Sequence, residues 1–89
     1  YPNPFNPSTT IEYDLGFVDG PYQRVNVIIY DIMGRNIKIL VNDEKSIGRY
    51  NVRWNGKDQN GVEVSSGVYF VHLTTDMGRS KTKKIMLMR

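Results

Sequence analysis

Hydrophobic and polar residues alternate along most of this 89-residue chain with a period of two. Residues 48–54 are the clearest case, because Tyr50, Val52 and Trp54 fall on one face while arginine and asparagine fall on the other. Such alternation is typical of half-buried β-strands, and no stretch shows the 3.6-residue period of an amphipathic helix. The pattern therefore predicts an all-β domain.

Turn signals rich in glycine, asparagine and aspartate divide the chain into seven such segments. The polar residues between the third and fourth segments, and the Asn-Gly-rich residues after the fourth, are expected to form loops or turns. Seven short antiparallel strands in so short a chain predict an immunoglobulin-like β-sandwich, with a small barrel as the alternative. The expected strands are residues 9–15, 24–31, 36–41, 48–54, 62–64, 68–75 and 79–89.

The first eight residues differ from this pattern, because three of the chain's four prolines, Pro2, Pro4 and Pro7, lie there beside Asn3. Proline fixes φ and cannot donate to a β-ladder, so residues 1–8 are expected to form a stiff, extended entry segment before a sandwich of residues 9–89. The apolar positions of the strands form the expected core: Ile11, Tyr13, Leu15, Val25, Val27, Ile29, Ile37, Ile39, Tyr50, Val52, Trp54, Tyr69, Val71, Leu73, Ile85 and Leu87.

Basic residues gather at the C-terminal end. Residues 79–89 carry five basic residues and no acid, so the rest of the chain has 7 basic and 9 acidic residues. This strip lacks the interleaved aromatic residues that stack on bases, which argues against nucleic-acid binding. The five basic residues are Arg79, Lys81, Lys83, Lys84 and Arg89.

The chain has no cysteine, no apolar run long enough to cross a bilayer and no signal-peptide pattern, so any export signal is expected upstream.

The last expected strand is a candidate sheet edge. Lys81, Lys83 and Arg89 share the parity of Ile85 and Leu87, so charged and apolar residues fall on one face. Either the strand changes its environment midway or it contains a bulge. An unpaired edge can accept a strand from a partner, and lysines on it can equally protect it against aggregation.

Candidate chemistry is sparse. The single histidine, His72, has no second histidine or cysteine with which to build a metal or acid–base site, so we expect neither enzyme activity nor a cofactor. The stretch "WNGKDQNGVEV" holds the oxygen donors Asp58, Asn60 and Glu63. Its two carboxylates do not meet the twelve-residue calcium register, which favours a hydrogen-bonded turn over a calcium site.

Four stretches in order carry a family resemblance: "YPNPFNPSTTIEY", "VIIYDIMGRNI", "WNGKDQNGVEVSSGVYFVHL" and "KKIMLMR". Together they cover nearly the whole chain and resemble the type A C-terminal sorting domain of type IX secretion substrates from Bacteroidetes-like bacteria. The third stretch is also similar to the immunoglobulin-like domain of flagellar hook-capping proteins.

The resemblance implies a module that directs an upstream cargo in the same chain from the periplasm through an outer-membrane translocon, to the cell surface or the medium. A sorting peptidase of the same system is the second implied partner. An alternative is a structural or adhesive immunoglobulin-like module that stays attached to a surface protein or extracellular fibre. The positions that match the family are Pro2, Asn3, Pro4, Gly34, Arg35, Gly67, Val68, Tyr69, Lys83 and Lys84.

Overall fold

The computed structural model describes residues 8–16 and 22–88, which form six β-strands and no helix. The expected all-β class is confirmed. The expected entry segment, including Pro2, Asn3, Pro4 and Pro7, lies outside the described residues except for Ser8, and so does Arg89. The strands are β1 (Thr9–Leu15), β2 (Tyr22–Asp31), β3 (Asn36–Ser46), β4 (Gly48–Trp54), β5 (Gly67–Thr75) and β6 (Ser80–Leu87).

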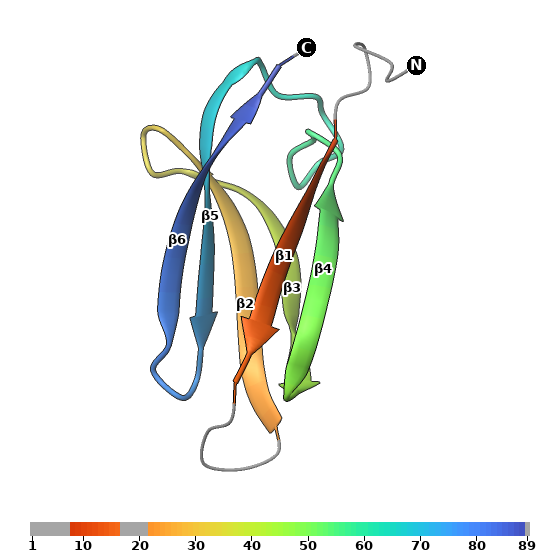
Figure 1. Ribbon diagram of the computed structural model, residues 1–89. Helices are drawn as coiled ribbons and strands as arrows, with labels where there is room; N and C mark the ends of the chain where they lie inside the picture. Colours follow the sequence, from red (N-terminus) through yellow and green to blue (C-terminus); the bar gives the residue numbers. More distant parts are fainter. Residues whose placement is uncertain (1–7, 17–21, 89) are drawn as a thin grey trace.

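The strands form two antiparallel sheets. β1 pairs with β4 in a two-stranded sheet, and a four-stranded sheet has the order β3-β2-β5-β6 (Figure 1). Ile47 alone separates β3 from β4, so the chain crosses from the larger sheet to the smaller one at that corner. In the described part of the chain, β1, β4, β3 and β6 therefore each have one edge without a paired strand.

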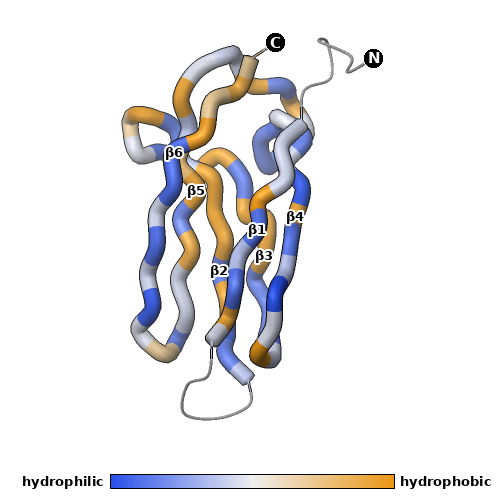
Figure 2. The backbone as a smooth tube through the Cα atoms, viewed as in Figure 1, coloured by the Kyte–Doolittle hydropathy of each residue, from blue (hydrophilic) through white to orange (hydrophobic). Residues whose placement is uncertain are grey.

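The core lies between the two sheets. Trp54 of β4 is fully buried and packs edge-to-face on Tyr69 of β5, with ring centroids 5.2 Å apart, so one aromatic pair joins the sheets. Figure 2 shows the concentration of hydrophobic residues most clearly along β2. Every buried hydrophobic residue among those the structure describes belongs to the predicted core: Ile11, Leu15, Val25, Val27, Ile29, Trp54, Tyr69, Val71 and Leu87. Other predicted residues pack half-buried against them: Tyr13, Ile37, Tyr50, Val52, Leu73 and Ile85.

The prediction of Ile39 as a core residue was wrong, because its side chain is 42% exposed. Val27 of β2 pairs with Val41, whereas the next residue, Ile28, pairs with Ile39. Leu40 is thus an extra residue on β3, and such a bulge reverses the alternation of the strand. Ile39 faces outward beside Ile28, while Leu40 and Val41 pack against the core.

Two strand predictions were also wrong. Residues 42–46, expected as a loop, extend β3 to Ser46 and pair with β2 back to Tyr22. They lie on an edge strand, where polar side chains stay solvated while the backbone remains paired. Residues 62–64, expected as a strand, contribute only the isolated bridge between Lys57 and Glu63. The described residues hold six strands, and a seven-stranded immunoglobulin-like sandwich is not confirmed.

Candidate recognition surface

β6 borders the larger sheet as the sequence predicted. It pairs with β5 in one continuous register, from Thr74 opposite Ser80 to Gly67 opposite Leu87. Its other side has no paired strand among the residues the structure describes (Figure 1). The backbone groups on that side are therefore available to a further strand.

The face of β6 that points toward the smaller sheet changes character along the strand. Lys81 and Lys83 lie on this face and are exposed, whereas Ile85 is half-buried and Leu87 is 3% exposed. The sequence left two explanations open, a bulge in this strand or a change from solvent to core along it. The continuous register excludes the bulge, so the same face of β6 passes from solvent into the core. Figure 2 shows β6 passing from hydrophilic to hydrophobic toward its C-terminal end.

We call Lys81, Lys83 and Lys84 the basic edge. Lys84 lies opposite Phe70 on the outer face of the sheet, so the three ammonium groups flank β6 on both faces. Within the described residues none of them forms an ion pair; the two salt bridges there join other side chains. Arg79 precedes the strand, and its guanidinium approaches Gly16 at the end of β1.

The expected site residues Gly34 and Arg35 lie in the turn between β2 and β3, which Asp31 organises. Gly34 has φ of 83°, a left-handed conformation that glycine adopts without strain. Oδ1 of Asp31 accepts the backbone N–H groups of Met33 and Arg35, both at 2.9 Å, and Oδ2 accepts Nε of Arg35 at 2.7 Å. Asp31 was not among the residues predicted from the sequence, although an aspartate three residues before a turn glycine is a recognisable turn signal.

These bonds predict an acid-sensitive turn. The backbone hydrogen bond from Arg35 is the main cause that holds the pKa of Asp31 below its usual value, and the Arg35 side chain adds to it. A lowered folded-state pKa stabilises the domain above the unfolded-state value of about 3.9, and this contribution disappears as pH falls through the folded-state pKa. We expect Asp31→Asn to lower the Tm by several degrees at neutral pH, and the gap from wild type to close in acid, measured by circular dichroism.

Asp14→Asn is the matched control for this turn. Asp14 bonds Nε of Arg49 at 3.0 Å, but both side chains are largely exposed, so this ion pair contributes little to stability. An equal loss of Tm in both variants, or a gap for Asp31→Asn that persists in acid, would contradict the role of Asp31.

The other matched family positions lie at the start of β5. Gly67 opens the strand opposite Leu87, and Val68 pairs with Met86. Tyr69 is 6% exposed, packs on Trp54 and donates its hydroxyl to the carbonyl of Ser65 at 2.7 Å. Tyr69 therefore has a structural role in the core. Among the matched positions that the structure describes, Lys83 and Lys84 are the two that lie on β6, whose outer edge has no paired strand there.

The calcium candidates lie in a tightly bonded turn. Oδ1 of Asp58 accepts the backbone N–H groups of Asn60 at 2.9 Å and Val62 at 3.0 Å, and the backbone N–H of Asp58 donates to the carbonyl of Val62 at 2.8 Å. This is the hydrogen-bonded turn that the sequence favoured. Across residues 8–16 and 22–88, no three histidine, cysteine, aspartate or glutamate side chains gather where they could hold a metal ion.

His72 lies on the outer face of the larger sheet. Its Nδ1 is 2.6 Å from the hydroxyl of Thr82, and its Nε2 is 3.5 Å from the hydroxyl of Ser80. These two contacts were not predicted from the sequence. Both hydroxyls belong to β6, so the contacts tie the outer faces of β5 and β6 together.

In the described part of the chain, no helix is long and apolar enough to span a membrane.

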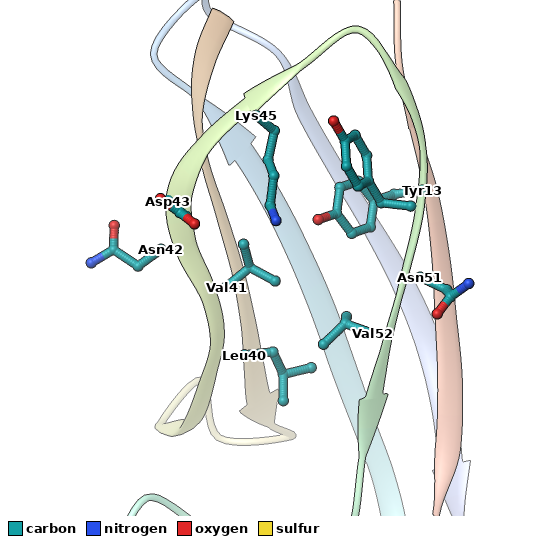
Figure 3. A pocket seen from close by; sticks show the side chains of 9 residues that line it. Tyr13, Leu40, Val41, Asn42, Asp43, Lys45, Asn51 and Val52 are labelled. Carbon is teal, nitrogen blue, oxygen red and sulfur yellow. The ribbon is translucent and has the colours of Figure 1, made fainter.

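A cleft of about 400 Å³ opens between β3 and β4, and it too was not foreseen. Figure 3 shows Val41 and Val52 pointing into it. Tyr13 and Tyr50 stack with ring centroids 5.5 Å apart, and the ammonium of Lys45 lies 5.2 Å from the Tyr50 ring. Burial, followed by the neighbouring Tyr50 and Asp43, raises the pKa of Tyr13 above its ordinary value. The residues that line the cleft come from β1, β3 and β4, so alternation within a single strand gave no signal for it.

Comparison with known proteins identifies the family. No curated protein and no solved structure matches the chain. The family model described as "Secretion system C-terminal sorting domain" matches residues 1–88, which include the Pro-rich entry segment and the basic edge. That family consists of sorting signals for type IX secretion. The chain belongs to the secretion system C-terminal sorting domains of type IX secretion.

Proposed function

We propose that this sorting domain carries an upstream cargo through the outer-membrane translocon and that the translocon recognises β6. The observation that carries the proposal is the edge of β6: among residues 8–16 and 22–88 it has no paired strand, and its lysines form no ion pair there. Exposed polar groups of one charge sign on an open strand combine main-chain affinity with long-range attraction. The rest of the fold holds that edge in place, because Ile85 and Leu87 anchor the same strand in the core.

The entry segment and the sorting peptidase complete the proposed route. Pro2, Pro4 and Pro7 restrict the backbone, so we infer that residues 1–8 form a stiff link between the cargo and β1. The domain passes through the periplasm with its cargo, and the peptidase then acts upstream of the sandwich, at the surface. The product is a cargo on the cell surface or in the medium.

In vivo photo-crosslinking tests the proposed partner. A photoreactive amino acid replaces Met86, which is 64% exposed on β6, or Asn51, which is exposed on β4, in a cargo fusion expressed in a type IX-competent host. We expect adducts with an outer-membrane translocon component, identified by mass spectrometry, from the Met86 position only. Equal adducts from both positions, or adducts from Asn51 alone, would refute recognition through β6.

The retained adhesive module is the competing function, and the extracellular protein decides between them. Removal by the peptidase leaves mature cargo without tryptic peptides from residues 9–89, whereas a retained module leaves these peptides in equal amount to cargo peptides. Mass spectrometry of the medium and of the surface fraction measures that ratio. Equal amounts of cargo peptides and of peptides from residues 9–89, in a strain with an active peptidase, would refute removal of the domain.

A further inference from the structure

The edges of the larger sheet differ in how they are protected. β3 is interrupted by register shifts, and Gln59 pairs with its edge: the Gln59 N–H donates to the carbonyl of Ile37, and the Ile39 N–H donates to Oε1 of Gln59. Bulges and such covering contacts are the usual protection of an edge strand. β6 has neither a register shift nor, among described residues, a covering segment over Ser80–Leu87. In that part of the chain, the protection that β6 does have is its row of lysines.

The basic edge determines which strand can pair with β6. A second copy of β6 would place lysines among lysines, and like charges on neighbouring strands destabilise pairing. A strand with acidic residues would instead place carboxylates beside Lys81 and Lys83 on one face and Lys84 on the other. Residues 79–89 contain no acid that could repel such a strand. The charges therefore disfavour self-pairing and favour an acidic partner.

The two ends of β6 also set a polarity for the partner. Lys81, Lys83 and Lys84 lie in the part of the strand that ends at Lys84, whereas Ile85, Met86 and Leu87 form its C-terminal end. Met86 is 64% exposed, so the apolar end retains uncovered surface. A complementary strand carries acidic residues at one end and apolar residues at the other.

We propose that β6 binds an extended acidic segment of its export machinery by strand addition, with carboxylates against the basic edge and apolar residues against Ile85–Leu87. This inference rests on the proposed function, since it names the chemistry of the partner that recognises the sorting domain. Main-chain hydrogen bonds hold the added strand, and the cross-strand charge pairs select it.

Binding of synthetic octapeptides to the purified 89-residue chain tests the inference. The probe alternates valine with threonine in its first half and glutamate with threonine in its second, and a reversed-order probe tests parallel addition. We expect fluorescence anisotropy to show that one of the two binds, and that replacing its glutamates by glutamine weakens binding about tenfold. Backbone N-methylation on alternate residues is expected to abolish binding, because it removes the donors that strand addition requires.

Two matched variants locate the site. Lys81, Lys83 and Lys84 are half of the six lysines of the chain, so changing all three to glutamine, or changing Lys38, Lys45 and Lys57 instead, lowers the formal net charge from +3 to 0 in both cases. The basic-edge variant is expected to bind the acidic probe about tenfold more weakly, and the other variant to bind it as wild type. Equal weakening in both variants, or undiminished binding of the N-methylated probe, would show charge attraction without strand addition and overturn the inference.

The remaining outcomes separate the two proposals. If neither probe binds but the domain still crosslinks to the translocon through Met86, the acidic-strand proposal is overturned. The proposed function is unaffected by that result. If the domain sediments as a dimer and the probe does not dissociate that dimer, a second copy of the chain occupies the β6 edge. This result would also overturn the acidic-strand proposal. Probe binding without any translocon crosslink would refute the proposed function and retain strand addition.

Discussion

Replacing Trp54 with alanine is expected to lower the free energy of unfolding by about 3–5 kcal/mol, the cost of removing a large buried aromatic side chain. Trp54 is 0% exposed, packs on Tyr69 across the sheets and donates Nε1 to the carbonyl of Lys57 at 2.9 Å. It thus joins the two-stranded sheet, the four-stranded sheet and the turn that follows β4. For a domain of this size such a loss lowers the Tm by more than about 10 °C, measured by circular dichroism or calorimetry.

Trp54→Phe separates packing from hydrogen bonding. The phenyl ring keeps much of the contact with Tyr69 but leaves the carbonyl of Lys57 without its indole donor, so we expect a smaller loss of about 1–3 kcal/mol. If the free energy of unfolding of Trp54→Ala lies within about 1 kcal/mol of the wild-type value, the view that this aromatic pair holds the sheets together is contradicted.

The core could be predicted from the sequence because alternation records burial directly. Trp54, Val25 and Leu87 are identified from the alternation alone, since the extra residue Leu40 lies on β3 and not on their own strands. Parity fails on β3, where the bulge at Leu40 turns Ile39 outward. A bulge depends on how two strands pair, and a single strand's sequence does not contain that information.

The candidate site was predicted less completely. The row of lysines was visible in the sequence, but two geometries fitted it, and only the continuous pairing of β6 with β5 decided between them. That Lys83 borders an unpaired edge depends on the strand order, which is a property of the whole sheet. Asp31 and the cleft beside Tyr50 depend on side-chain contacts that sequence periodicity does not report.

Neutralising the basic edge is expected to abolish most cargo export while leaving the fold intact. The variant changes Lys81, Lys83 and Lys84 to glutamine, and all three side chains are exposed, so their loss removes no core contact. Because these charges are the proposed attraction for the translocon, we expect the extracellular fraction of a fused reporter to fall about tenfold or more. Immunoblots of medium, surface and periplasmic fractions measure it.

The variant of Lys38, Lys45 and Lys57 controls for net charge, since it removes the same three charges from other elements. Its export is expected to match wild type, and the Tm of the basic-edge variant is expected to stay within a few degrees of wild type. Equal export of the two variants would refute recognition through the basic edge, whereas a low Tm of the basic-edge variant would refute the claim that the fold stays intact without these lysines.

The location of a fused reporter tests whether this domain is by itself a type IX export signal. A periplasmic reporter with its own signal peptide is fused before Tyr1 and expressed in a type IX-competent strain and in the same strain without the outer-membrane translocon. We expect reporter outside the competent cells and accumulation of reporter in the periplasm of the strain without the translocon. Reporter retained in the periplasm of both strains, or exported equally by both, would contradict this expectation.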